Sequence, residues 1–267
     1  MNKTAVSNRK QWSLLLVLLF LFGSPIICNA ARKVGKQYRE SAKYYRFDIG
    51  RTFPSNRYLS GSAVAPEVAE VELNRFFEAL DDLGLKFVRK SGLKKVIICR
   101  NLKLNGMPCG GVAAGSTILM NAGFSKKTVY HEMFHIFDSA NEDKSWQRLN
   151  HKKFMYRKID FPDRPVSRGH KSKLKKRDQK YGHLNFAKDF ASAYAQSNEK
   201  EDRAETFAFM VAEGKNFTAR AMKSPALWGK MHYIIDVTSR RSLLDENYWR
   251  KKLGTEAMNK NRFKKRK

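Results

Sequence analysis

The stretch TVYHEMFHIFD, Thr128 to Asp138, decides how the rest of this chain of 267 residues is interpreted. It contains His131, Glu132 and His135 in the order H-E-x-x-H. In an α-helix, residues four positions apart lie on the same face, so the two imidazole rings can bind one ion. Zinc accepts nitrogen ligands of this kind. The pattern therefore predicts a helix that carries two zinc ligands, with Glu132 beside the metal as a candidate general base.

The residues around this motif favour an active-site helix over two unrelated histidines, because the chain has only 6 His. Ser125 is a suitable N-cap, and the helix is expected to end near Asn141. Asp138 is either a carboxylate that steadies the site or a surface carboxylate, and the sequence leaves both open. The apolar positions that can pack into a core are Val129, Met133, Ile136 and Phe137.

A catalytic zinc site usually has three protein ligands, and two downstream carboxylates are candidates for the third. Asp178, in RDQKYG, resembles the D-x-x-Y-G element of aspartate-liganded zinc proteases, but it lacks the preceding Gly-Thr and lies in a Lys/Arg-rich stretch. Glu201, in KEDRAETFAF, lies on a predicted helix with an apolar face. A rigid helix holds ligand geometry better than a loop, so Glu201 is the favoured ligand.

The order H-E-x-x-H, then Tyr194, then Glu201 seven positions later resembles the catalytic domain of anthrax lethal factor. It is also similar to the secreted Pro-Pro endopeptidases, and both groups are zincins with a glutamate as third ligand. The segments ILMNAG, SWQRLN and FASAYAQSNEKEDRAETFAFM resemble uncharacterised secreted bacterial zinc metallopeptidases. The resemblance extends from Val96 to Glu213.

This resemblance implies a zinc endopeptidase with one Zn²⁺ per chain. The three implied metal ligands are His131, His135 and Glu201. Glu132 is then the general base, and Tyr194 donates a hydrogen bond to the oxyanion of the tetrahedral intermediate. Glu205, one helical turn after Glu201, is expected to orient one of the histidine ligands.

The remaining pattern predicts an α+β fold: a zincin-like domain with a small sheet, the active-site helix and a mostly helical C-terminal part. The strand Gly115–Asn121, just before the active-site helix, is expected to be an edge strand that pairs with an extended substrate. Residues 160–184 are expected to form a long polar loop. The other expected elements are a helix from Pro66 to Gly84, a strand over Lys94–Cys99, and helices near Ser197, over Ala226–Thr238 and over Leu243–Leu253.

Residues 1–30 have the layout of a secretory signal peptide, with a basic start, an apolar run over Trp12–Gly23 and a cleavage point after Ala30. The alternatives are an uncleaved anchor and a lipoprotein signal at Cys28, which the bulky Ile27 disfavours. We therefore expect a secreted, periplasmic or cell-envelope protein. The expected divisions are a polar basic N-terminal segment over 31–65, a metallopeptidase domain over 66–255 and a basic tail over 256–267.

Two cysteines, Cys99 and Cys109, remain after such a cleavage. An even count in an exported chain favours a disulfide, and the turn-forming Asn105, Gly106 and Pro108 lie between the two. Two free thiols are the alternative.

The formal net charge is +28, from 53 Lys and Arg against 25 Asp and Glu. Basic residues cluster in Arg164–Lys180 and in Asn259–Lys267. Such runs attract an anionic cell-envelope or polysaccharide surface, or they are solvated segments without a partner. Nucleic acid is not expected, because it conflicts with the signal peptide. The alternative function is an exported basic binding protein with a structural or inactive zinc site; four protein ligands would be needed to close a structural site.

Overall fold

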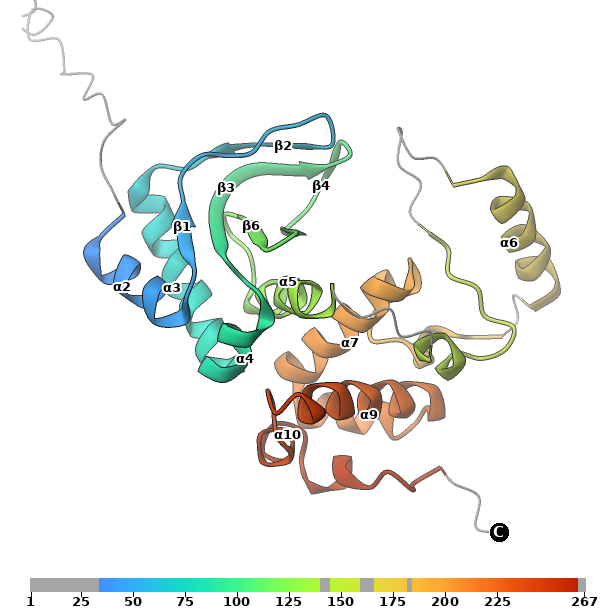
Figure 1. The fold of residues 1–267 in the computed structure, drawn as a ribbon. Helices are drawn as coiled ribbons and strands as arrows, with labels where there is room; N and C mark the ends of the chain where they lie inside the picture. Colours follow the sequence, from blue (N-terminus) through green and yellow to red (C-terminus); the bar gives the residue numbers. More distant parts are fainter. Residues whose placement is uncertain (1–33, 140–144, 159–165, 182–183, 264–267) are drawn as a thin grey trace, which may run out of the picture. The chain divides into compact units, whose positions relative to one another are not determined.

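A small mixed sheet organises the N-terminal half of the protein, as the blue and green ribbons of Figure 1 show. The computed structural model describes residues 34–139, 145–158, 166–181 and 184–263. The sheet has six strands in the order β1-β3-β6-β5, with β2 and β4 both paired to β3. Their bounds are β1 Asp48–Gly50, β2 Leu59–Ala63, β3 Lys95–Leu104, β4 Met107–Pro108, β5 Gly111–Ala114 and β6 Thr117–Asn121.

Strands β1, β3 and β6 are parallel, whereas β5 runs antiparallel to β6 at the edge of the sheet. The β-branched run from Val96 to Ile98 lies near the start of β3, and its residues are buried. Sequence reasoning placed the edge strand at Gly115–Asn121. That expectation is wrong in position: the corresponding strand β6 lies between β3 and β5, so the edge strand is β5.

Two of three neighbouring helices pack against this sheet, and the third packs on those two helices within the main core. Helix α3 (Pro66–Leu83) begins with a proline in its first turn and ends at Gly84, whose φ of 80° suits glycine. Helix α4 (Leu85–Ser91) follows directly, and helix α5 (Lys126–Asp138) carries the H-E-x-x-H motif. The expected mixed α+β class is therefore confirmed, with a small sheet and several helices.

The C-terminal half is helical, as expected. Helix α7 packs across α5, where the rings of Phe207 and Phe134 stack with centroids 4.7 Å apart. The bounds of the helices are α7 Glu199–Glu213, α8 Lys215–Ala221, α9 Pro225–Arg240, α10 Glu246–Leu253 and the 3-10 helix η5 Thr255–Met258. Ala257, within the stretch assigned to the basic tail, is buried in the core.

Residues 34–65, within the expected polar basic N-terminal segment, form a helix and two strands. Helix α2 (Lys36–Tyr45) buries Tyr38, Ala42 and Tyr45, and strands β1 and β2 join the sheet. Although the segment is polar in composition, its aromatic side chains bury apolar area. The ring of Tyr45, for example, packs on Phe47 and Phe77. This part of the segment therefore belongs to the same core as the rest of the domain.

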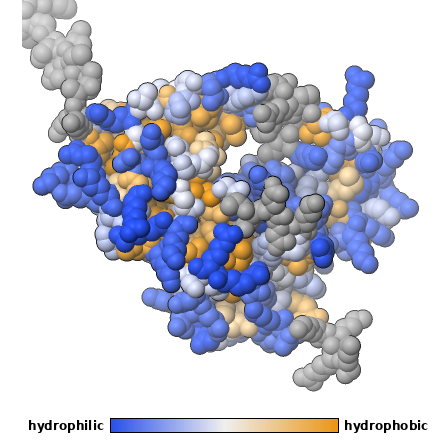
Figure 2. Space-filling model, in the orientation of Figure 1, coloured by the Kyte–Doolittle hydropathy of each residue, from blue (hydrophilic) through white to orange (hydrophobic). Residues whose placement is uncertain are grey.

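Part of the expected polar loop over residues 160–184 is a helix, α6 (Arg168–Tyr181). Its buried Arg177 lies over the rings of Phe154 and Phe186, at 6.0 and 5.9 Å from their centroids. Charged residues lie on all sides of this helix, so its sequence has no apolar face. For that reason the sequence pattern did not predict a helix here. Figure 2 shows this helix as mostly hydrophilic, and its exposed cationic residues are Arg168, Lys171, Lys173, Lys175, Lys176 and Lys180.

The expected disulfide between Cys99 and Cys109 is not formed, since both are free thiols. The backbone N–H of Cys109 donates to the carbonyl of Leu102, three residues along β3 from Cys99. The two thiols donate to different carbonyls, of Met120 and Leu102.

The expected signal peptide, residues 1–30, lies outside the described residues, as do Asn141 and the end of the basic tail. Among the helices that the structure describes, none is both long and apolar enough to cross a membrane.

Candidate metal centre

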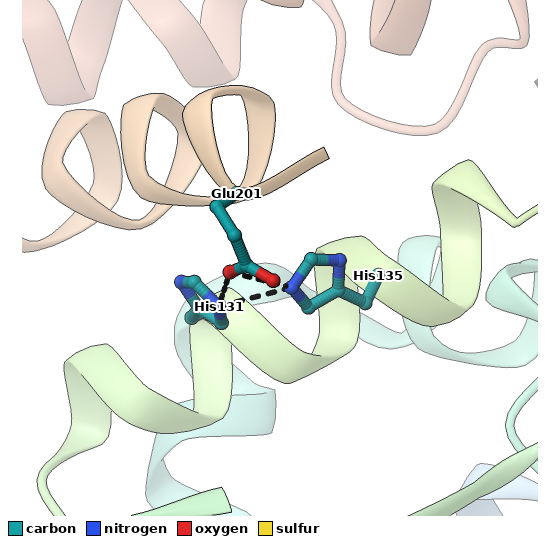
Figure 3. Close-up of side chains that lie close together, drawn as sticks. All are labelled: His131, His135 and Glu201. Carbon is teal, nitrogen blue, oxygen red and sulfur yellow. Dashed lines mark hydrogen bonds and ion pairs between the residues drawn. The ribbon is translucent and has the colours of Figure 1, made fainter. Parts of the chain in front are cut away.

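Helix α5 presents both motif histidines on one side while its apolar residues enter the core. The hydroxyl of Ser125 accepts a hydrogen bond from the backbone N–H of Thr128, so Ser125 caps the helix as expected. Val129 and Met133 are completely buried. This packing fixes the rotation of α5 about its axis, and it leaves His131 and His135 facing helix α7 (Figure 3).

Glu201 reaches the two histidines from the first turn of α7 (Figure 3). The side chain of Asn198 caps this helix by accepting from the N–H groups of Lys200 and Glu201, at 2.9 and 3.0 Å. Oε2 of Glu201 lies 3.0 Å from Nε2 of His131 and 3.3 Å from Nε2 of His135. The contact between α5 and α7 thus brings Glu201 next to His135 and His131, which precede it by 66 and 70 positions in the sequence.

The spacing of these three atoms fits a metal ion. The two Nε2 atoms of His131 and His135 are 3.0 Å apart, so all three separations lie between 3.0 and 3.3 Å. A tetrahedral zinc site with bonds of about 2.0–2.1 Å places its ligand atoms about 3.3 Å apart. Among the described residues, His131, His135 and Glu201 form the cluster whose donor atoms could hold a metal ion.

The electrostatics of the cluster also favour a cation. Burial lowers the pKa of His131, but hydrogen bonds to Glu201 and Glu205 and the charge of Glu132 outweigh it and raise the pKa to about 10. Burial raises the pKa of Glu201, yet hydrogen bonds from both histidines hold it well below its ordinary value. The cluster therefore contains an anionic carboxylate, Glu201, and a protonated imidazole, His131. A metal ion can take the place of that proton.

Glu205 lies one turn further along α7 and contacts the other nitrogen of His131. Its Oε1 is 2.9 Å from Nδ1 of His131, and its Oε2 accepts a hydrogen bond from the Ser192 hydroxyl at 2.5 Å. Such a carboxylate fixes the ring orientation and leaves Nε2 available to a metal. The structure thus places Glu205 where the sequence predicted a residue that orients a histidine.

Glu132 is buried beside the cluster and held by the edge strand β5. Only 5% of its surface is exposed, and its carboxylate accepts a hydrogen bond from the backbone N–H of Ala113. Burial raises the pKa of Glu132, while the charges of His131 and His135 act against that rise. A carboxylate with a raised pKa is suited to accept a proton near neutral pH.

Tyr194 lies at the open side of the cluster, in the 3-10 helix η4 (Tyr194–Gln196). Its ring centroid is 6.1 Å from that of His131, and 45% of the residue is exposed. Partial burial and the charges of Glu201, Glu132 and Glu205 raise its pKa, so the hydroxyl stays protonated and can donate a hydrogen bond.

The other two predicted carboxylates lie elsewhere. Oδ2 of Asp138 accepts a hydrogen bond from Nε of Arg203 at 2.7 Å, in a buried ion pair between α5 and α7. Asp178 is on α6, where it is mostly exposed and pairs with Arg177. Of the two candidates for the third ligand, the structure therefore brings Glu201 to the histidines.

Sequence reasoning missed several residues that support this site. Asp202 and Arg203 follow Glu201 directly, and each forms a buried ion pair with a different helix: Asp202 with Lys230 of α9, and Arg203 with Asp138 of α5. The signal available in the sequence was the presence of charged residues, Asp202 and Arg203, at positions of α7 that belong to its packed side. Strand β5 was also missed, because its small residues give no alternating pattern.

A cleft runs past the cluster. Two hollows of about 340 and 480 Å³ share His131, Glu132 and Tyr194 in their walls. The first extends towards the β3–β4 hairpin, along Leu104 and Met107. The site is thus open to a ligand larger than water.

Comparisons with known proteins give one solved structure and one family model. A solved structure from Bacteroides caccae ATCC 43185, described as a "putative zinc-binding metallo-peptidase", is 14% identical with a TM-score of 0.49 over 82% of this chain and 92% of that one. A comparison with curated proteins finds no match. A family model described as "Putative zinc-binding metallo-peptidase" matches residues 114–262, which is more than half of the 267 residues and includes all three candidate ligands. The chain belongs to this family of zinc-binding metallo-peptidases.

Proposed function

We propose that this protein is a zinc-dependent endopeptidase of the zincin type, with glutamate as the third metal ligand. The observation that carries the proposal is the convergence of His131, His135 and Glu201 within 3.3 Å of one another, with Glu132 next to them. The resemblance to the catalytic domain of anthrax lethal factor and to the Pro-Pro endopeptidases rests on the same residues and on Tyr194.

In this proposal, His131, His135 and Glu201 would hold a zinc ion, which when bound would supply Lewis-acid activation of water and of the scissile carbonyl. Glu132 takes a proton from the attacking water and later delivers a proton to the leaving amine. Its burial raises its pKa, which brings the carboxylate closer to the pH at which it must both accept and release a proton.

Tyr194 is proposed to stabilise the negative charge that develops on the carbonyl oxygen. Its hydroxyl remains protonated because burial and the surrounding carboxylates raise its pKa. A donor placed where charge develops stabilises the transition state more than the ground state. Its position on the wall of both hollows supports this role.

The edge strand β5 is proposed to bind the substrate backbone. The N–H of Asn121 donates to the carbonyl of Gly110, so in this antiparallel pair the peptide groups of Gly111 and Ala113 point away from β6. Both residues lie against Glu132, which places the outer edge of β5 along the cleft. Because the N–H of Ala113 is taken by Glu132, an extended peptide that adds to this edge would pair with the remaining peptide groups and pass the metal ligands.

Export through residues 1–30 is part of the proposal, supported by the basic start and apolar run of the sequence. Mass spectrometry of the protein from the culture medium or envelope should give a chain that begins at Ala31. A chain that retains Met1 would contradict cleavage at this point.

Peptide hydrolysis can be tested directly with the purified protein and a mixture of unstructured peptides. We expect cleavage by the zinc-loaded protein, loss of cleavage with a chelator, and recovery when zinc is added. Glu132→Ala is the matched control, because it should keep zinc while removing cleavage. Cleavage that survives in Glu132→Ala would contradict the proposed mechanism, and a parent protein that holds zinc but cleaves no peptide would favour the binding-protein alternative.

A further inference from the structure

Gly111, on the edge strand β5, is in direct contact with the side chain of Glu132. A Cβ atom added at Gly111 would lie 2.7 Å from Cγ, 3.0 Å from Oε1 and 3.1 Å from Cδ of Glu132. Real Cβ atoms essentially never approach other heavy atoms to less than 3.0 Å. Residue 111 therefore has room for a hydrogen atom and no more, and the space that a methyl group would need is filled by Glu132.

The contact is not explained by the backbone conformation of Gly111. Among the described residues, the glycines with positive φ are Gly84, Gly92, Gly106, Gly115, Gly123, Gly214 and Gly254. Gly111 is not one of them, and it stands in regular register opposite Met120 of β6. Any residue could adopt this strand conformation, so the reason for glycine here is the side chain that lies against it.

The next outward-facing residue of β5 holds the same carboxylate. The N–H of Ala113 donates a hydrogen bond to Glu132, two residues after Gly111 on the same edge of the strand. One residue thus leaves the space for the carboxylate and the other provides its hydrogen-bond donor. Since β5 is fixed by its pairing with β6, the edge strand determines where this carboxylate stands.

We propose that Gly111 is a positioning residue for the general base, and that its missing side chain lets Glu132 stand against β5 at the metal cluster. The role of Glu132 in this inference rests on the proposed peptidase function. The steric contact itself does not depend on that function, and it can be measured separately.

A methyl group at residue 111 would displace the more flexible partner. Glu132 has three side-chain torsions, whereas the backbone of β5 is held by the sheet. The contact involves Cγ as well as the carboxylate, so displacing Glu132 should lower the melting temperature, and a shift of about 1 Å in a reacting group can lower a rate about 100-fold. The predicted signature of Gly111→Ala is therefore a large loss of catalysis in a folded protein that still binds zinc.

The first test compares Gly111→Ala with Gly50→Ala. Gly50, on β1, is also crowded, because an added Cβ would lie 2.8 Å from Cγ1 of Ile97, yet this contact is between β1 and β3 and not at the metal cluster. We expect Gly111→Ala to keep one zinc per chain and to lower kcat about 100-fold. Gly50→Ala should lower the melting temperature and leave kcat unchanged. A kcat for Gly111→Ala equal to that of the parent would overturn the proposal.

The second test needs no activity and uses chelator-treated, metal-free protein. Gly111→Ala is made in the parent and in the Glu132→Ala background, and the melting temperature of each is measured. In the parent the new methyl meets Glu132, whereas in the second background that side chain is gone, so the fall in melting temperature should be smaller there. Equal falls in both backgrounds would show that residue 111 does not press on Glu132. A protein that cleaves no peptide but shows this coupling would refute the peptidase function alone.

Discussion

The ammonium group of Lys230 lies 2.8 Å from Oδ2 of Asp202, and neither side chain is exposed to solvent. This ion pair joins α9 to α7 one residue after the candidate metal ligand Glu201. The same oxygen of Asp202 accepts hydrogen bonds from Nε1 of Trp146 at 3.0 Å and from the hydroxyl of Tyr156 at 2.8 Å. The buried pair therefore orients the first turn of α7, from which Glu201 reaches the histidines.

Lys230→Met should destabilise the protein strongly, because it leaves the carboxylate of Asp202 buried without its counter-charge. Removal of one partner of a buried ion pair typically costs about 3–5 kcal/mol of unfolding free energy. Replacing both partners, as Lys230→Met with Asp202→Asn, should cost less than Lys230→Met alone. Urea unfolding of the three proteins checks this order, and a cost below about 1 kcal/mol for Lys230→Met would show that the pair does not hold α7.

Glu201→Ala should lower zinc affinity sharply, whereas Asp178→Ala should leave it unchanged. The reason is position: Glu201 lies 3.0 Å from Nε2 of His131, and Asp178 is exposed on α6 beside Arg177. Metal content after dialysis against a weak chelator distinguishes the two variants. Zinc loss in the Asp178 variant alone would assign the site to the aspartate-liganded class.

Glu205→Ala should weaken zinc binding without removing a ligand. The carboxylate holds Nδ1 of His131 at 2.9 Å, and loss of such a partner typically lowers metal affinity about 10–100-fold. A competition titration with a zinc-binding dye measures the change. Glu213→Ala, on the same helix but paired with Arg220, is the control and should bind zinc like the parent.

Tyr194→Phe should lower kcat and leave zinc content and melting temperature nearly unchanged. The substitution keeps the ring and removes only the hydroxyl that we assign to the oxyanion. Loss of one such donor costs about 10²–10³ in kcat, and KM should change less. Steady-state kinetics on one cleaved peptide checks this split, and a kcat within about twofold of the parent would show that the hydroxyl takes no part.

Asp82, on α3, should make stability sensitive to acid. Burial raises its pKa, but the hydrogen bond from Tyr130 and the charges of Lys252 and Lys126 outweigh it and hold the pKa below its ordinary value. The charged carboxylate therefore stabilises the fold above the unfolded pKa of about 3.9, and this contribution is lost as the pH falls through the lower folded value. Asp82→Asn should be less stable than the parent at pH 6, and the gap should narrow towards pH 2.5 in urea unfolding. A gap independent of pH would contradict this assignment.

Local signals in the sequence predicted much of the scaffold. Pro66 and Gly84 mark the two ends of α3, and Ser125 caps α5, because caps and breakers act on neighbouring backbone groups. Helix α6 and the N-terminal helix α2 were missed. Their stability depends on aromatic rings from other segments, such as Phe154 and Phe186 beneath Arg177, and no local pattern carries that information.

The sequence by itself determined the pair of candidate metal ligands, because His131 and His135 are one helical turn apart and any helix puts them on one face. It also favoured Glu201 over Asp178, through the apolar pattern of the helix that carries Glu201. Only the tertiary structure decided that α5 and α7 cross where all three donor atoms meet, that β5 rather than β6 is the edge strand, and that Gly111 makes room for Glu132. These relationships depend on packing between segments distant in the chain, whereas periodicity and capping report only on residues within a few positions of each other.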